Sequence, residues 1–202
     1  MFDPTLYLHL SFAVMLTALA FGISWIMSRF APIVDEPNHR SSHMKTVPRS
    51  GGLSVVITFY IGFAFSWQLG YLDFVDKTLL AGFAASTFLI AVVSLIDDIT
   101  EQSAVVKLVT QIIAIVIVLY LGILLDVIAI PVVGYVQLGF LGYVVSFFWI
   151  LGLTNAYNFM DGLDGLAGGV AVIVSFFFLI ITYNEGSTFV YILSYSVLAG
   201  AL

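Results

Sequence analysis

The sequence predicts an all-α polytopic membrane protein with about seven transmembrane helices. Of its 202 residues, 61% are hydrophobic and only 9% are charged, whereas a soluble domain carries roughly 25% charged residues. The apolar runs approach the roughly 20 residues that a helix needs to cross the hydrocarbon core. Neither a repeat nor a low-complexity tract interrupts the pattern, so residues 1–202 are expected to form one transmembrane domain.

The expected spans follow one another along the chain. They are Leu6–Met27, Gly52–Leu69, Thr78–Ile96, Val105–Leu125, Phe140–Ala156, Leu166–Tyr183 and Thr188–Leu202. The first run is too long for a signal-peptide core and lacks a basic leader, so we expect a retained helix. The last run has no closing loop, and we therefore expect the chain to be a fragment. Residues 126–139 contain Pro131, Gly134 and alternating β-branched residues, which predicts a short interfacial hairpin.

The basic residues predict the orientation. If the loop at residues 28–51 is cytoplasmic, the cations on the inside are Arg29, Arg40, Lys45, Arg49 and Lys107. Only Lys77 then lies outside, as the positive-inside rule requires. The N-terminus is accordingly expected on the outside. The Asp97–Asp98 pair and the segment 155–164 both fall on the cytoplasmic face.

Composition excludes several functions. No cysteine is present, which rules out disulfides, thiolate metal sites and cysteine nucleophiles. The formal net charge is −6 and no basic surface for nucleic acid is evident. The lipid bilayer is the partner that composition itself identifies.

The segment from 155 to 169 is the most informative. It places Asn155, Asn158, Asp161 and Asp164 between two apolar runs. Carboxylates there are costly unless they have a partner or a function. Their three-residue spacing drifts by about 60° per step on an α-helix but lines one face of a 3₁₀ turn. Four glycines between 162 and 169 let a bulky ligand approach the backbone. Helix capping and close helix packing are the alternative, which the density of polar residues disfavours.

Two further clusters remain open to two interpretations. Asp97 and Asp98, with Glu101 one turn later, either repel each other until a divalent cation such as Mg²⁺ binds or form an ordinary solvated helix end. Lys107, with Gln111 one turn on, either extends to the membrane interface or holds a phosphate between itself and a metal.

The loop from Asp35 to Gly52 mixes cations, two histidines, hydroxyls and a glycine pair. Backbone N–H groups at a helix start, with arginine nearby, suit a phosphate. A basic loop held by lipid headgroups fits the composition equally well.

Taken together and in this order, the motifs resemble the polyprenyl-phosphate N-acetylhexosamine-1-phosphate transferases, the membrane glycosyltransferase family 4. The matching segments are Asp35-x-Pro-Asn-x-Arg-Ser-Ser-His43 with Pro48-Arg-x-Gly-Gly52, the pair Asp97–Asp98, and Asn155-x-x-Asn-Phe-x-Asp-Gly-x-Asp-Gly-Leu166. The Arg-Ser-Ser-His form is similar to the bacterial undecaprenyl-phosphate GlcNAc-1-phosphate transferases. That branch serves lipopolysaccharide O-antigen and other cell-envelope polysaccharides.

The resemblance implies a reaction. Such enzymes transfer N-acetylhexosamine 1-phosphate from a UDP-sugar to undecaprenyl phosphate, giving polyprenyl-diphospho-sugar and UMP. The reaction takes place at the cytoplasmic face of the bacterial inner membrane, with a periplasmic N-terminus. Mg²⁺ is the implied cofactor, or Mn²⁺ in its place. A second copy of the chain, in a homodimer, is the one protein partner we consider.

The same resemblance implies residue roles. Asp97 and Asp98 would be the catalytic pair and would also hold the metal together with Asn158. The residues implied to bind substrate are Lys107, Asn155, Asn158, Asp161 and Asp164, with His43 and Arg49 at the entrance. Val47 and Ser50 are minor departures from the family pattern. Because the family has ten or eleven helices and further aspartate and histidine loops, we expect no turnover from residues 1–202 alone.

Three rival functions fit less well. A CDP-alcohol phosphotransferase motif begins like Asp161-Gly-Leu-Asp-Gly165, but Gly168 and Gly169 stand where Ala-Arg is required. A secondary transporter places its acids near the midplane, often in repeated halves, whereas the acids here gather at one face. A purely structural membrane scaffold predicts that the aspartates are dispensable.

Overall fold

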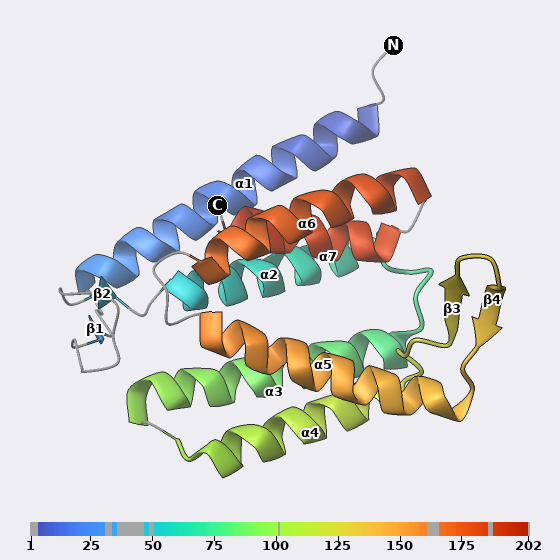
Figure 1. Cartoon of the computed structure of the whole chain (residues 1–202). Helices are drawn as coiled ribbons and strands as arrows, with labels where there is room; N and C mark the ends of the chain where they lie inside the picture. The colour runs from blue at the N-terminus through green and yellow to red at the C-terminus, as the bar shows by residue number, and fades with distance from the viewer. Residues whose placement is uncertain are drawn as a thin grey trace. The chain divides into compact units, whose positions relative to one another are not determined.

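The structure is a computed structural model in which the chain divides into two compact units (Figure 1). It describes residues 4–30, 34–35, 47–48, 51–100, 102–160, 166–185 and 188–201. One unit combines residues 1–75 with 161–202, and the other is the continuous stretch 76–160. The prediction of a single domain stays a prediction.

The described part of the first unit consists of four helices and a short strand pair. Its elements are α1 (Pro4–Phe30), β1 (Val34–Asp35), β2 (Val47–Pro48), α2 (Gly51–Gln68), α6 (Leu166–Glu185) and α7 (Thr188–Ala201). Helix α7 packs against the other three helices. Small residues permit this packing, since a Cβ on Gly62 would lie 2.6 Å from the Ser196 hydroxyl oxygen. The antiparallel β1–β2 pair was not predicted from the sequence.

The second unit contains the remaining elements. They are α3 (Lys77–Thr100), α4 (Ala104–Tyr120), β3 (Val127–Ile130), β4 (Gly134–Gln137) and α5 (Phe140–Met160). Helix α4 packs against both α3 and α5. The antiparallel pair β3–β4 confirms the hairpin predicted near residues 126–139. Its turn has Pro131 followed by Val132 at φ 74°, and the Val133 N–H donates to the Ile130 carbonyl, as in a type II turn.

The all-α prediction is confirmed, with seven helices in the part of the chain that the structure describes. Among the described residues, three helical stretches are long and apolar enough to cross a membrane, namely Ser11–Arg29, Lys77–Thr100 and Phe140–Met160. Three shorter apolar helices accompany them, at Gly52–Gln68, Ala104–Tyr120 and Leu166–Thr182. That all seven helices cross the bilayer stays a prediction.

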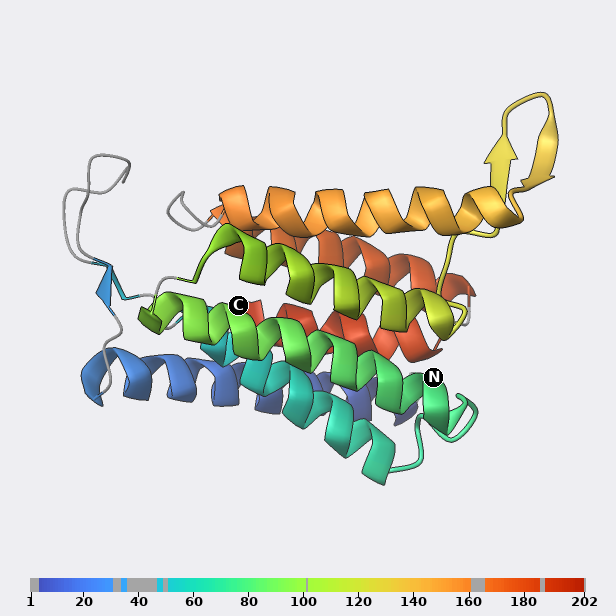
Figure 2. The ribbon, with the colours of Figure 1, turned by 90° about the horizontal axis from the view of Figure 1, so that it is seen from below.

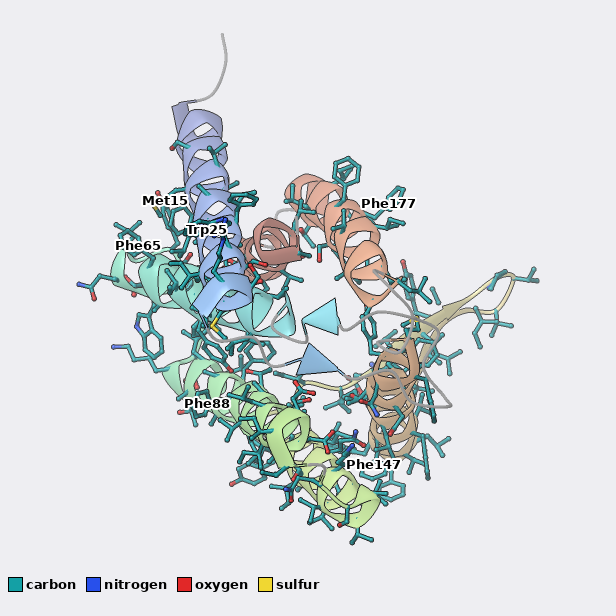
Figure 3. The ribbon with its side chains drawn as sticks, turned by 90° about the vertical axis from the view of Figure 1, so that its left-hand side faces the viewer. Met15, Trp25, Phe65, Phe88, Phe147 and Phe177 are labelled. Atoms are coloured by element: carbon teal, nitrogen blue, oxygen red, sulfur yellow. The ribbon has the colours of Figure 1, made fainter. Side chains whose placement is uncertain are left out.

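The helix surfaces are apolar, while several buried positions carry serine or threonine. Phe88 on α3 is 57% exposed, and Phe177 on α6 is 58% exposed within the other unit (Figure 3). Buried hydroxyls such as that of Ser66 donate to a carbonyl one turn earlier in the same helix. Because lipid tails offer no hydrogen bonds, this arrangement suits helices whose outer surface meets lipid.

Two of the helices that extend further than the hydropathy predicted carry candidate site residues. Helix α3 continues beyond Ile96 to Thr100, so Asp97 and Asp98 lie on its last turn and not in a loop. Helix α5 continues beyond Ala156 to Met160, so Asn155 and Asn158 lie on an α-helix and not on a 3₁₀ turn. Hydropathy marks where apolar side chains end, whereas a helix continues while its backbone hydrogen bonds are satisfied.

Helix α4 is shorter than predicted and ends at Tyr120 instead of Leu125. Gly122 adopts φ 81° and donates its N–H to the Leu119 carbonyl, and the Ile123 N–H donates to the Val118 carbonyl. This pair of bonds is the Schellman motif, which requires a residue in the left-handed region and therefore favours glycine.

Candidate functional site

One end of the second unit, called the polar end below, carries the candidate site residues of this unit, from Asp97 to Lys107 and from Asn155 to Asn158. The C-terminal end of α3, the N-terminal end of α4 and the C-terminal end of α5 lie together there, and the hairpin lies at the opposite end (Figure 2). The short connection between α3 and α4 makes the two helices antiparallel neighbours. The topology therefore brings the predicted Asp97–Asp98 and Asn155–Asn158 positions to the same end.

Asp97 is held by two partners of different kinds. Its Oδ2 lies 2.5 Å from the Lys107 Nζ, and its Oδ1 accepts the backbone N–H of Gln102 at 2.7 Å. The Asp97 side chain is 21% exposed and that of Lys107 is 34% exposed. The carboxylate orientation is thus set from both α4 and the connection that precedes it, while part of the group stays accessible.

The position of Lys107 follows from how α4 begins. Ser103 is the N-cap residue, with an extended backbone, and its hydroxyl accepts the Val106 N–H at 3.3 Å. Lys107 consequently falls in the first turn of α4 and faces the last turn of α3. A lysine that extends to the interface was one of two predicted roles, and the ion pair shows that its ammonium group is directed to Asp97.

Asn155 is bound across the other helix interface. Its Nδ2 donates to the Gln111 Oε1 at 3.0 Å and to the Leu151 carbonyl at 2.8 Å. Gln111 lies one turn after Lys107 on α4. Helix α4 therefore contacts both polar groups, Asp97 through Lys107 and Asn155 through Gln111.

The remaining predicted residues have different places. Asp98 follows Asp97 on the same turn and is half-buried, and Asn158 lies one turn beyond Asn155 and is exposed. His43, Arg49, Asp161 and Asp164 lie outside the described residues. Their roles, like those of the other predicted site residues, stay predictions.

The donor set fits a hard divalent cation. Each carboxylate oxygen has two lone pairs, so both Asp97 oxygens keep an acceptor position after the bonds to Lys107 and Gln102. Asp98 adds a second carboxylate on the same turn. Within the described ranges, no three His, Cys, Asp or Glu residues cluster as a metal cage. Mg²⁺ commonly uses one or two carboxylates and completes its shell with phosphate oxygens and water.

Sequence reasoning missed the groups that orient the site. It assigned no role to the Gln102 backbone amide, the Ser103 cap or the Gln111 side chain. The Lys107–Gln111 spacing of four residues was a usable signal, because such residues lie on one face of a helix. The Gln102 contact had no signal, since it depends on where α3 ends.

Comparison with known proteins identifies relatives of the chain. The profile of Glycosyl transferase family 4 matches residues 80–202. The probable undecaprenyl-phosphate N-acetylglucosaminyl 1-phosphate transferase of Bacillus subtilis is 32% identical over 170 residues, which are 84% of this chain and 46% of that protein. The decaprenyl-phosphate N-acetylglucosaminephosphotransferase of Mycolicibacterium smegmatis is 33% identical over 169 residues, 81% of this chain and 41% of that protein.

A more divergent relative is the undecaprenyl-phosphate alpha-N-acetylglucosaminyl 1-phosphate transferase of Escherichia coli. It is 27% identical over 176 residues, 84% of this chain and 45% of that protein. The chain thus spans about half the length of the curated relatives it matches. No solved structure matches the chain. The family resemblance drawn from the motifs is confirmed.

Proposed function

The chain belongs to glycosyl transferase family 4, and we propose that it carries part of the site of a sugar-1-phosphate transferase. The substrates are a UDP-N-acetylhexosamine and undecaprenyl phosphate. A lipid phosphate oxygen attacks the phosphorus that bears the sugar, and the bond from that phosphorus to the bridging oxygen breaks. UMP leaves, and the sugar phosphate remains on the lipid as a diphosphate. The observation that carries this proposal is the Asp97–Lys107 pair beside Asp98, within a family whose named relatives perform such transfers.

The charges at this end suit the reaction. A lipid phosphate and a diphosphate repel each other, so a site for both needs cations, and Lys107 supplies one. Asp97 holds the Lys107 ammonium group in place before substrate arrives. Mg²⁺ bound by Asp97, Asp98 and the Asn158 amide would neutralise further phosphate charge. Phosphoryl transfer depends mainly on positioning and electrostatics, which these side chains can provide without a covalent intermediate.

Helix length supports a site at the bilayer edge. Asp97 lies twenty residues after Lys77, the first residue of α3. At 1.5 Å per residue this separation is about 30 Å, the thickness of a typical hydrocarbon core. Lys77 and Asp97 can therefore sit at opposite interfaces. The phosphate of a polyprenyl lipid lies at that depth, which explains carboxylates at a helix end.

We further propose that the Asp97 end of α3 faces the cytoplasm at a bacterial inner membrane. The proposed pathway is the synthesis of envelope polysaccharides of the O-antigen type. These proposals rest on the distribution of basic residues and on the motif resemblance. The absence of cysteine makes the orientation easy to test. Thr100→Cys should react with a membrane-impermeant maleimide only after the cytoplasmic side is opened. Val132→Cys, at the hairpin tip, should react in intact cells, and the reverse pattern would contradict the orientation.

The activity is tested on the complete protein that contains these residues, purified into liposomes with undecaprenyl phosphate. Labelled UDP-GlcNAc and UDP-GalNAc are supplied separately, with Mg²⁺, with Mn²⁺ or with EDTA. We expect UMP release and label in the lipid fraction with one of the sugars, and neither product with EDTA. Uptake of labelled solute into the liposomes without UMP release would instead indicate a transporter.

A further inference from the structure

A pair of side-chain amides joins α4 to α5 at the polar end of the second unit. The Nδ2 of Asn155 donates to the Oε1 of Gln111 at 3.0 Å, and both side chains are half-buried. The same Nδ2 donates to the Leu151 carbonyl at 2.8 Å. Asn155 is thus held by two acceptors, one from its own helix and one from the neighbouring helix.

The two acceptors determine which way the Asn155 amide faces. A primary amide has two N–H donors and one oxygen acceptor. The Leu151 carbonyl can only accept, and the Gln111 oxygen accepts here, so both N–H groups of Asn155 are used. The Oδ1 of Asn155 is the group left for a ligand. Among the described residues, no hydrogen-bond donor reaches that oxygen.

We infer that Gln111 is a positioning residue that makes Asn155 present its oxygen to the substrate. The inference deepens the proposed function and rests on it, because Asn155 is one of the residues that the family resemblance implies to bind substrate. An oxygen in this place receives a hydrogen-bond donor of the sugar nucleotide or a cation that accompanies its diphosphate. Without Gln111, one N–H of Asn155 loses its partner and the amide can rotate.

Helix α4 connects the Gln111–Asn155 hydrogen bond to the rest of the site. Lys107 and Gln111 are four residues apart and therefore lie on one face of α4. Lys107 holds Asp97 on α3, and Gln111 holds Asn155 on α5. A single rigid helix thereby sets the orientation of an anionic group and of a neutral oxygen acceptor.

The test uses two substitutions of similar size at one position, in the complete protein. Gln111→Glu keeps an acceptor for Asn155, whereas Gln111→Met fills the same volume without one. We expect Gln111→Met to raise KM for the UDP-sugar about three- to tenfold, the range for one lost hydrogen bond. We expect kcat and the KM for undecaprenyl phosphate to stay within about twofold. Gln111→Glu should remain within about twofold of the wild type in all three constants.

Controls separate positioning from packing. Thr154→Val removes a hydroxyl bond to the Ile150 carbonyl on the same helix but leaves the Gln111–Asn155 bond in place, and should change no constant. In an Asn155→Ala background, Gln111→Met should have no further effect, because Gln111 acts through Asn155. The inference would be overturned if Gln111→Glu and Gln111→Met raised KM for the UDP-sugar equally. It would also be overturned if Gln111→Met raised this KM by the same factor in the Asn155→Ala background as in the wild type. If Gln111→Met raises the Mg²⁺ concentration for half-maximal activity and not KM, the result supports the inference and identifies the cation as the ligand of the Asn155 oxygen.

A spectroscopic readout keeps the inference separate from the proposed function. In protein labelled with [¹⁵N]asparagine, the two side-chain N–H resonances of Asn155 are assigned by their loss in Asn155→Ala. Gln111→Met should shift them, whereas Gln111→Glu should leave both N–H groups hydrogen-bonded and Thr154→Val should leave them unchanged. Resonances unaffected by Gln111→Met would overturn the inference even if the transferase activity is found. Absence of activity in the wild type would overturn the proposed function, and the resonances would still decide the role of Gln111.

Discussion

The helices of the second unit contact one another through different kinds of groups at its two ends. At the polar end, α3, α4 and α5 are joined by the Asp97–Lys107 ion pair and the Gln111–Asn155 amide bond. At the hairpin end, the chain after α4 contacts α5 through backbone groups and small residues. The Ser146 hydroxyl accepts the Leu125 N–H at 2.7 Å. A Cβ on Gly142 would lie 2.6 Å from the Leu125 carbonyl oxygen.

This difference indicates that the polar end contributes mainly to catalysis and the hairpin end mainly to stability. The contacts at the hairpin end are made by the buried residues Gly142 and Ser146, which are poorly accessible to a ligand. The contacts at the polar end use half-exposed charged and amide groups that retain lone pairs or donors. Substitutions at the polar end should therefore affect catalysis more than stability, and those at the hairpin end should do the reverse.

The largest effect is expected for Asp98→Asn in the complete protein. The substitution removes a carboxylate from the proposed metal and phosphate site but keeps the size of the side chain. We expect kcat to fall by about 10²-fold or more, as for loss of a preorganised electrostatic group. Initial rates of UMP release measure this, and the melting temperature in detergent should change little.

The matched control is Asp126→Asn at the hairpin end. Asp126 contributes its backbone carbonyl to the Leu138 N–H, and the substitution leaves that bond intact. We expect unchanged kcat. A loss of activity for Asp126→Asn equal to that for Asp98→Asn would contradict the proposed difference between the two ends.

The second prediction concerns the ion pair. Lys107→Met removes the charge next to Asp97 and should lower kcat/KM by tenfold or more, since a cation facing phosphate contributes several kcal/mol to such sites. Its effect on the free energy of unfolding should stay below about 1 kcal/mol, because partly exposed ion pairs stabilise little. Kinetics and thermal unfolding of one preparation give both values. Lys77→Met, at the other end of α3, is the control and should alter neither value. If Lys107→Met lowered the free energy of unfolding by as much as it raised the activation free energy, Lys107 would have a structural role.

The third prediction is for the hairpin end and concerns stability. Gly142→Ala forces a Cβ against the Leu125 carbonyl oxygen, and we expect a loss of about 1–3 kcal/mol in the free energy of unfolding. Gly152→Ala lies on the same helix and its Cβ would meet no atom within 4 Å. That control should be neutral or stabilising by roughly 0.5–1 kcal/mol, because alanine favours a helix over glycine. Thermal unfolding in detergent distinguishes them, and equal melting temperatures would show that the close approach is unimportant.

The helices and the hairpin could be predicted from the sequence because they depend on local patterns. Apolar runs gave α3, α4 and α5, and Pro131 with Gly134 indicated the hairpin. Asn155 was proposed as a site residue because polar groups between apolar runs are costly. The Asp97–Asp98 pair was proposed because adjacent carboxylates repel unless a divalent cation binds.

The ends of the helices and the cross-helix contacts could not be predicted. The extension of α3 to Thr100 depends on backbone hydrogen bonds, to which hydropathy is insensitive. The Asn155–Gln111 contact joins residues 44 positions apart and requires the packing of α4 against α5. The end of α4 depends on Gly122, whose position after a long apolar run was not interpreted as a stop.

The smallest effect is expected for Asp76, which caps the start of α3 at the hairpin end. Its Oδ1 accepts the N–H groups of Leu79 and Thr78 at 3.0 and 2.8 Å, and these bonds lower the pKa of the exposed carboxyl group against a smaller opposing effect of desolvation. A folded pKa below the unfolded value means that the ionised cap stabilises the protein above the unfolded pKa. That stabilisation is lost as the pH falls through the folded pKa.

Asp76→Ser keeps a capping oxygen but removes the titrating group. The melting temperature of the wild type should therefore fall more steeply than that of the variant between about pH 5 and pH 3, the range around the ordinary aspartate pKa. Above this range the two proteins should differ only slightly. The kinetic constants should be the same in both near neutral pH, because this cap lies a full helix length from Asp97. Parallel melting curves across the acid range would show that the charge on Asp76 does not stabilise α3, and a kinetic effect would show that the two ends are coupled through that helix.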